Sequence, residues 1–284
     1  MQNLRSIDDV CEAIKKEALS SCRMKSPRIL AEPAAEPTEG GFVRVDAELF
    51  LRLFDDEDRE TAIKMLASML LVSAEIFSAK NQTEQCPEQI IIPKDFLGYI
   101  DLFKLIQQPL SFGRRVILAI DGRCGAGKTT LAKIITNVYG GDFISTDDFY
   151  LPFEFRTPER MAIPGGHIDY DRFIKQISDP IKAGQTHLEY YNFNCFTKTA
   201  TPKTAKLNNN VIVIEGSYSL HPWINDLYSL SAFLNISDSI QKERILKRNG
   251  EEGYERFKNI WIPFEDNYHR VYKAHKRCSI LINQ

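Results

Sequence analysis

A glycine-rich loop that directly follows an apolar run is the feature that most restricts the fold of this chain. Residues 116–120 are all apolar, and three glycines occur within the six residues 122–127. Lys128 and Thr129 complete the pattern Gly-x-x-x-x-Gly-Lys-Ser/Thr, and the following residues have the apolar spacing of a helix. In this strand–loop–helix order the pattern predicts a phosphate-binding loop. The alternative is a glycine-rich turn that happens to precede a helix.

The residue types in this loop explain why it would bind a phosphate chain. Glycines let successive backbone N–H groups face one point, and the positive end of the following helix lies at the same point. We expect Lys128 to place its charge near the β- and γ-phosphates and the Thr129 hydroxyl to hold Mg²⁺. The predicted nucleotide-binding residues are Gly122, Arg123, Cys124, Gly125, Ala126, Gly127, Lys128, Thr129 and Thr130.

Two further strands are expected to bring acidic side chains to the loop. The short run 143–145 precedes Asp147 and Asp148, and the apolar run 211–214 precedes Glu215. The carboxyl ends of parallel strands face the crevice where ligands bind in an open α/β sheet. Asp147 is therefore a candidate base for a hydroxyl proton and a candidate magnesium ligand, and Glu215 is a second magnesium ligand. Asp147 also fits a helix cap or turn, and Glu215 also fits a solvent-exposed strand end.

Basic and aromatic residues beyond the loop have two interpretations each. Arg244 and Arg248 lie near the end of a predicted helix, where they would stabilise charge on the transferred phosphoryl group. A basic helix C-terminus favoured by the helix dipole explains them equally well. His167 follows a Gly-Gly turn and either orients a substrate or is simply exposed. Trp261 is expected to be a packing residue.

The order of the predicted elements gives the fold class. Strands alternate with helices through residues 111–284, which predicts an α/β domain with the P-loop NTPase fold, a mostly parallel sheet with helices on both faces. Residues 1–110 are predicted to form a small, mainly helical accessory region. Its helices are expected after Ser6, at 58–79 and at 94–107, with a short strand at 42–45.

Charge and hydropathy exclude several classes of partner. The formal net charge is −2 at pH 7, and the sequence has no basic stripe with interleaved aromatic residues, so nucleic-acid binding is not expected. The apolar stretch 65–77 is interrupted by polar residues and is shorter than the ~20 residues of a membrane helix. The six cysteines form no Cys-x-x-Cys pair, and the N-terminus does not resemble a signal peptide. We expect a cytoplasmic protein, and the sequence leaves homo-oligomer formation open.

Several motifs together resemble the uridine kinase/phosphoribulokinase family of small-molecule kinases. The resemblance covers roughly residues 115–283, and the Asp-x-Phe-Tyr run that ends at Tyr150 narrows it within the P-loop superfamily. It implies ATP- and Mg²⁺-dependent transfer of the γ-phosphoryl group to a hydroxyl of a small metabolite. By this resemblance the catalytic residues are Lys128, Asp147, Arg244 and Arg248. On the acceptor side it implies Tyr150, Asp169 and Tyr191, and Pro263 and Glu265 fit the family's closing helix.

The acceptor segment departs from the family pattern at three positions. Asn192, Phe196 and Lys198 stand where the family's nucleoside kinases usually carry Asp, His and Arg. Loss of a histidine that hydrogen-bonds a pyrimidine edge changes discrimination by ~10⁴-fold or more. The predicted acceptor is therefore a nucleoside or another ribose- or polyol-containing metabolite. The alternative is a nucleotide-gated regulatory ATPase that uses the N-terminal region as its effector and has no small-molecule acceptor.

Overall fold

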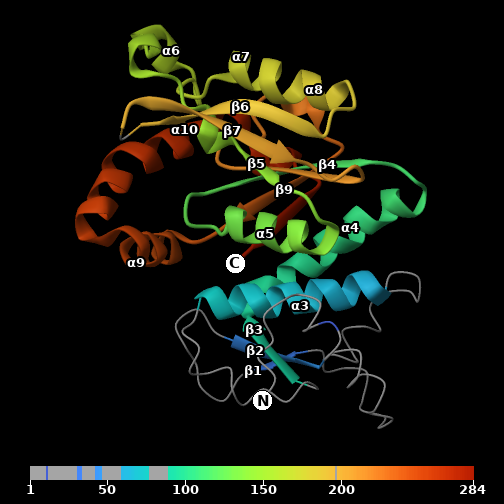
Figure 1. Ribbon diagram of the computed structural model, residues 1–284. Coiled ribbons are helices and arrows are strands. Elements are labelled where there is room, and N and C mark those ends of the chain that lie inside the picture. Colours follow the sequence, from blue (N-terminus) through green and yellow to red (C-terminus); the bar gives the residue numbers. More distant parts are fainter. Residues whose placement is uncertain (1–10, 12–30, 34–41, 47–58, 77–88, 196) are drawn as a thin grey trace, which may run out of the picture. The chain divides into compact units, whose positions relative to one another are not determined.

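The computed structural model describes residues 11, 31–33, 42–46, 59–76, 89–195 and 197–284 (Figure 1). Contacts divide the chain into two units. The first contains residues 1–107 with 133–138, and the second contains residues 108–132 with 139–284. The helix expected after Ser6 and the side chain of Phe196 lie outside the described residues.

The described part of the first unit combines two helices with a small sheet. The helices expected at 58–79 and 94–107 are present, and the second one begins with a short 3₁₀ turn. The expected strand at 42–45 is the middle strand of a three-stranded antiparallel sheet, whose other two strands were not predicted. The bounds are β1 Ala31–Pro33, β2 Phe42–Asp46, α3 Arg59–Ile76, β3 Gln89–Pro93, η3 Lys94–Gly98 and α4 Tyr99–Ser111.

The second unit is built on a five-stranded sheet in which every neighbouring pair is parallel, as predicted. The strand order is β10-β9-β4-β8-β5, so the strand before the glycine-rich loop is central. Every residue of β8 is buried, which explains its uninterrupted apolar run. The bounds are β4 Val116–Gly122, β5 Phe143–Ser145, β8 Val211–Glu215, β9 Leu230–Asn235 and β10 Ile280–Asn283.

Helices lie on both faces of this sheet, which confirms the predicted fold class. Figure 1 shows α7 and α8 on one side of the sheet and α5 on the other. The main helical segments are α5 Lys128–Tyr139, α6 Pro158–Ala162, α7 Tyr170–Phe173, η6 Ile174–Ser178, α8 Asp179–Lys182, α9 Asp238–Arg256, η8 Phe257–Trp261, α10 Ile262–Tyr272 and α11 Ala274–Arg277. The part of the chain that the structure describes contains no helix long and apolar enough to span a membrane.

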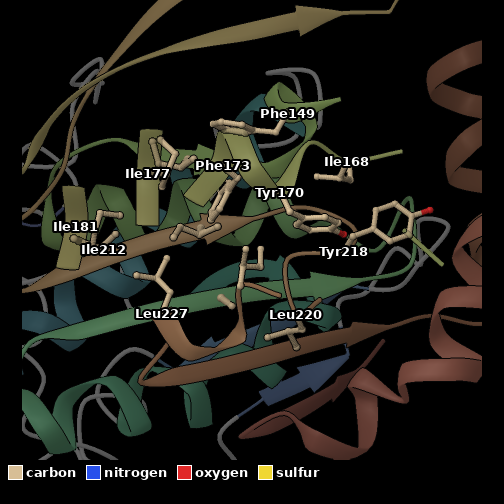
Figure 2. Packing of buried hydrophobic residues seen from close by; sticks show 14 of the residues in the cluster. Phe149, Ile168, Tyr170, Phe173, Ile177, Ile181, Ile212, Tyr218, Leu220 and Leu227 are labelled. Carbon is tan, nitrogen blue, oxygen red and sulfur yellow. The ribbon is translucent and has the colours of Figure 1, made fainter. Parts of the chain in front are cut away.

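An apolar core fixes the segment that follows β5. Phe173, Ile177 and Ile181 recur every four residues and pack with Ile212 of β8 in one buried cluster (Figure 2). An antiparallel hairpin, β6 (His187–Asn194) and β7 (Thr199–Lys206), lies outside the parallel sheet and was not predicted as a hairpin. Tyr190 of this hairpin stacks on Phe149 at a centroid distance of 5.5 Å. The turn after β5 is therefore held by both the helices and the hairpin.

Candidate functional site

The glycine-rich loop lies between β4 and α5, as its pattern predicts. Gly122 has a φ of 143°, and a Cβ atom there would lie 2.2 Å from the carbonyl oxygen of Leu234. Gly127 has a φ of 84° immediately before the first residue of α5. Both positions require glycine, so that the backbone can turn at the edge of the sheet and begin the helix.

A buried acid that the sequence analysis did not select holds the base of the loop. Asp121 accepts hydrogen bonds from the N–H groups of Gly122 (2.6 Å), Tyr218 (3.2 Å) and Leu220 (3.0 Å), and from the Tyr268 hydroxyl (2.8 Å). Burial raises the pKa of Asp121, and these hydrogen bonds partly oppose the rise. The available signal was an acid inside an otherwise apolar central strand, because a buried charge requires several partners.

The Lys128 ammonium is bound to oxygen atoms around the loop. It donates to the carbonyls of Gly122 (2.8 Å) and Arg123 (3.1 Å) and to the Ser217 hydroxyl (3.1 Å). A lysine has three N–H donors, so these contacts occupy all of them. The lysine is therefore at the loop, as predicted, and a phosphate would replace part of this set.

Glu215 lies beside the residues that were expected to share magnesium with it. The Thr129 and Ser145 hydroxyls donate hydrogen bonds to its carboxylate. Burial, followed by the charge of Asp147, raises the pKa of Glu215 to about 7, although Lys128 opposes the rise. The side chain is 3% exposed, so the interpretation of a solvent-exposed strand end is wrong.

The donor set at Glu215 and Thr129 fits Mg²⁺. Carboxylate and hydroxyl oxygens are hard ligands, and Mg²⁺ is commonly bound by one or two carboxylates together with substrate phosphates and water. Within the described residues no group of three or more His, Cys, Asp or Glu side chains could hold a metal ion alone. The geometry therefore suits a metal that arrives with a nucleotide.

The two neighbouring acids after β5 have different surroundings. Asp148 is 6% exposed and accepts from the Tyr190 hydroxyl (3.1 Å) and the Lys203 ammonium (2.7 Å). Asp147 is exposed by accessible area, and its carboxylate accepts no hydrogen bond from the described residues. Protein atoms nevertheless crowd Asp147. This partial burial raises its pKa, and Lys128 opposes the rise. Asp147 is thus the acid that is open to a ligand.

The two arginines of α9 lie at the loop and at the acids. Arg244 donates to the carbonyl of Gly125 at 3.1 Å. The charge of Arg248 lowers the pKa of Asp147, and its guanidinium lies 5.5 Å from the ring centre of Phe257. Both residues therefore lie near the loop and the acids, and their predicted role in stabilising charge on the transferred phosphoryl group stays a prediction.

His167 is buried beside Tyr150, and the interpretation of His167 as an exposed residue is wrong. Its side chain is 1% exposed and stacks on the Tyr150 ring at 5.7 Å. Trp261 (5.9 Å) and Phe264 (5.5 Å) also lie near the ring. Burial lowers the pKa of His167 to about 3, and its Nε2 atom has no hydrogen-bond partner in the part of the chain that is described. A neutral nitrogen without a partner among the described residues therefore lies within this aromatic cluster.

Two predicted acceptor residues meet at an arginine that sequence reasoning missed. Asp169 caps α7 and accepts from the N–H (3.1 Å) and Nε (3.3 Å) of Arg172. Tyr191 is 51% exposed, and its carbonyl, not its ring, contacts the Arg172 guanidinium. Arg172 also donates to the carbonyls of Asp148 (3.1 Å) and Tyr150 (3.4 Å). It joins the acid turn, the helix cap and the hairpin, and no local pattern marked it.

The sheet and its loop define an α/β protein of the P-loop class. The chain is 28% identical over 170 residues to uridine-cytidine kinase C of Dictyostelium discoideum, which covers 58% of this chain and 36% of that protein. It is also 26% identical over 182 residues to a uridine kinase of Lactiplantibacillus plantarum, in a match that covers 60% of this chain and 86% of that protein. These matches confirm the resemblance to uridine kinases that the motifs predict.

No protein-family model matches the chain. A solved structure from Bacillus stearothermophilus, described as a possible uridine kinase, is 19% identical and covers 64% of this chain and 99% of its own, with a TM-score of 0.46. The match to the Dictyostelium protein spans just over a third of that protein's length.

Proposed function

We propose that this chain is an ATP- and Mg²⁺-dependent kinase that transfers the γ-phosphoryl group to a hydroxyl of a small metabolite. The observation that carries the proposal is the convergence of Lys128, Asp147 and Glu215. The charges of both Lys128 and Asp147 act on the Glu215 carboxyl, and Lys128 acts on Asp147. We therefore assign the glycine-rich loop, the candidate metal ligands Thr129 and Glu215, and Asp147 to one site.

The nucleotide side of this reaction needs positioning and charge neutralisation more than covalent chemistry. The loop N–H groups and Lys128 would bind the phosphates, and Thr129 and Glu215 would hold Mg²⁺, which supplies positive charge to the phosphate oxygens. The guanidinium groups of Arg244 and Arg248 would stabilise charge on the transferred group.

Asp147 is the group that would accept the acceptor hydroxyl's proton. It has no hydrogen bond to the described residues, whereas Asp148 is bound to Tyr190 and Lys203. A base is most effective when its pKa lies near the working pH, and the pKa of Asp147 is shifted in that direction. The reaction therefore assigns one role to each acid, with Asp147 in catalysis and Asp148 in the support of the hairpin.

The acceptor would lie between the acids and the aromatic side chains around His167. The two curated relatives are named as a uridine-cytidine kinase and a uridine kinase, which supports a nucleoside or similar polyol. Asp169 retains acceptor capacity beside its Arg172 contacts, because a carboxylate has about four lone-pair sites. Asn192 and Lys198 replace the family's usual residues, so we propose a ribose- or polyol-containing acceptor and not uridine specifically.

One observation supports a second candidate, a nucleotide-gated ATPase without an acceptor. The Asp169 carboxylate is used in a helix cap, and the Tyr191 ring is half exposed, so two predicted acceptor residues have internal or solvent contacts.

An acceptor screen tests the two candidates. ADP release is measured with Mg–ATP and a panel of nucleosides, pantothenate, nicotinamide riboside and sugar phosphates. The kinase proposal expects release that depends on one acceptor class and yields a phosphorylated product by mass spectrometry. Slow hydrolysis that no acceptor accelerates would favour the ATPase.

A further inference from the structure

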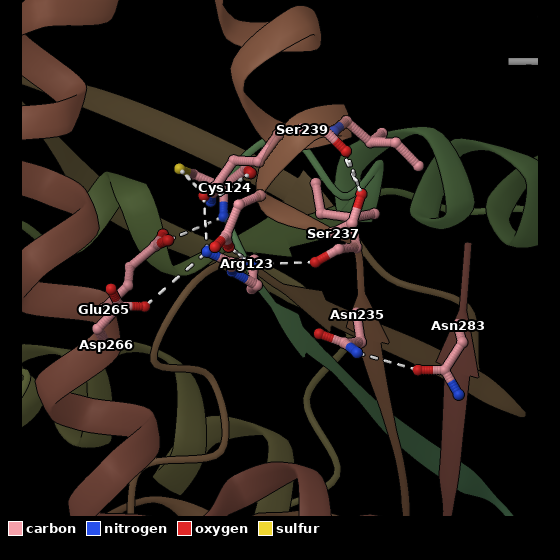
Figure 3. Close-up of polar contacts among 12 residues, drawn as sticks. Arg123, Cys124, Asn235, Ser237, Ser239, Glu265, Asp266 and Asn283 are labelled. Carbon is pink, nitrogen blue, oxygen red and sulfur yellow. Dashed lines mark hydrogen bonds and ion pairs between the residues drawn. The ribbon is translucent and has the colours of Figure 1, made fainter.

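Helix α10 carries a buried carboxylate, Glu265, that contacts the glycine-rich loop. The proposed reaction gives this carboxylate no role. Glu265 is 4% exposed. Its Oε2 atom accepts from the N–H of Cys124 at 2.9 Å, and its Oε1 atom accepts from the Ser217 hydroxyl at 2.6 Å (Figure 3 shows Glu265 beside Cys124). A buried carboxylate with both oxygens bound to the loop region is a specific attachment, because an unpartnered charge would be costly there.

The Ser217 contact connects Glu265 to Lys128. The hydroxyl of Ser217 lies 2.6 Å from Glu265 and 3.4 Å from the Gly122 carbonyl, so its single proton goes to the nearer Glu265 oxygen. Its lone pairs then accept from the Lys128 ammonium at 3.1 Å. Glu265 therefore determines the direction of the Ser217 hydroxyl, and that hydroxyl occupies one of the three donors of Lys128. The Glu265 charge also raises the pKa of Asp147, which places it near the proposed chemistry.

Helix α9 holds the same part of the loop from its own side. The Gln241 side chain donates to the carbonyl of Cys124 at 3.1 Å and accepts from Arg123 at 2.8 Å. Arg123 also donates to Asp238 at 2.6 Å. The N–H of Cys124 is thus bound to α10 and its carbonyl to α9. The first half of the loop depends on these distant contacts as well as on its glycines.

One face of the η8–α10 segment reaches both sides of the site. Trp261, Phe264, Glu265 and Tyr268 follow the spacing i, i+3, i+4 and i+7, so they share one helix face. Trp261 and Phe264 lie near the His167 ring, Glu265 binds the loop, and the Tyr268 hydroxyl donates to the buried acid of β4 at 2.8 Å. The same face therefore contacts the nucleotide side and the acceptor side.

We propose that Glu265 is a positioning residue for the nucleotide. Its carboxylate sets the shape of the loop through Cys124 and the direction of the Lys128 ammonium through Ser217. The inference goes beyond the proposed function, and its nucleotide-binding test is independent of any acceptor.

The test compares Mg–ATP affinity in Glu265→Gln, Ser217→Ala and the double variant by isothermal calorimetry at 25 °C. Glutamine keeps the shape of the side chain but removes its charge. Its NH₂ group also replaces one of the two oxygens that accept from the Cys124 N–H and the Ser217 hydroxyl. We expect the Kd of Glu265→Gln to rise about 10- to 100-fold, as for loss of a hydrogen bond to a charged group. The double variant is expected to bind more tightly than the product of the single effects predicts, because both changes act on Lys128.

Glu255→Gln is the matched control. This exposed α9 residue pairs with Lys258 at 3.6 Å, and its variant is expected to bind Mg–ATP within about twofold of the wild type. Melting temperatures distinguish nucleotide positioning from a merely structural role of Glu265. In a merely structural role, Glu265→Gln would lower Tm and leave the Kd at 25 °C unchanged. That result would overturn the inference, and so would tighter binding by Glu265→Gln, which would make the carboxylate a competitor of phosphate. A weakened Kd without acceptor-dependent transfer in the wild type would keep the inference and reject the kinase.

Discussion

Glu215, Asp147 and Glu265, three of the described carboxylates near the Lys128 ammonium, have different environments. Glu215 is buried with two hydroxyl donors, Asp147 is open to solvent, and Glu265 is hydrogen-bonded to the loop. Different environments separate the protonation behaviour of groups that are chemically alike. The same functional group, a carboxylate, can therefore serve as a metal ligand, a base and a positioning group within a single site.

The raised pKa of Glu215 predicts a pH-dependent cost to stability. The folded-state pKa is about 7 and the ordinary value is 4.5, so the folded protein holds this proton more tightly than the unfolded chain does. The contribution of Glu215 to stability is therefore most favourable below pH 4.5 and is lost as the pH rises to about 7.

Urea unfolding of Glu215→Gln and wild type, without nucleotide, measures this effect. The variant is expected to gain roughly 3 kcal/mol relative to the wild type between pH 4.5 and 7.5, from the size of the shift. The difference between the two proteins removes the contributions of the buried histidines. A difference that stays constant with pH would contradict the assigned environment.

The neighbouring acids are predicted to respond differently to the same substitution. Asp147→Asn is expected to lower kcat by about 100- to 10 000-fold, the usual contribution of a general base, with little change in the Kd for Mg–ATP. Asp148→Asn is expected to cost about 1–3 kcal/mol in the free energy of unfolding, because the Lys203 and Tyr190 partners lose a charged acceptor. Kinetics and denaturant unfolding of both variants check this. Normal turnover by Asp147→Asn would remove it from the base role.

At the level of elements, β4 and its loop need close approach to β9. A Cβ atom at Gly122 would lie 2.2 Å from the carbonyl of Leu234, whereas one at Gly113 would meet no atom within 4 Å. Both glycines have positive φ, 143° and 66°. A side chain would be strained at either position, but only the one at Gly122 would also collide with another strand.

Gly122→Ala is predicted to destabilise the protein far more than Gly113→Ala. The second change is expected to cost about 1–2 kcal/mol, the price of positive φ alone. The first adds displacement of a strand and is expected to exceed about 4 kcal/mol, a size that indicates a specific mechanism. Chemical denaturation measures both values. Equal losses would show that the approach to β9 is not limiting.

The elements also differ in how well the sequence predicts them. The β4–loop–α5 unit depends on neighbouring residues, so its pattern was sufficient. The hairpin β6–β7 was missed because its outer strand is mostly exposed and gives no apolar alternation. Arg172 was missed because its partner nearby in the sequence is the Asp169 carboxylate, whereas the backbone carbonyls that it joins are up to 24 residues away and leave no mark in the sequence.

For the whole molecule, ligand binding is expected to appear as added stability. At a free Mg–ATP concentration of about 100 times its Kd, the free energy of unfolding should rise by about 2.7 kcal/mol. Lys128→Ala is expected to abolish this gain, because the loop loses the charge that is expected near the β- and γ-phosphates. Thermal unfolding with and without nucleotide measures it, with Lys133→Ala on the same helix as control. A full gain in Lys128→Ala would contradict the nucleotide-binding loop.

The parallel sheet and the position of the acids could be predicted because parallel strands bring their carboxyl ends together. The polar contacts that complete the site could not. Glu265 and Cys124 are 141 positions apart, and Tyr268 and Asp121 are 147 apart. The burial of His167 could not be predicted either, because it comes from the rings of three other segments, Tyr150, Tyr218 and Trp261.

Cys124 illustrates a practical consequence of how the loop is enclosed. Its thiol is 9% exposed, and burial with the nearby Glu265 charge raises its pKa to about 12. Because the thiolate is the reactive form of cysteine, this raised pKa makes the thiol a poor nucleophile at pH 7. Alkylating reagents are therefore expected to react more slowly at Cys124 than at the partly exposed Cys195 and Cys278, so that thiol labelling would leave the phosphate-binding backbone chemically intact.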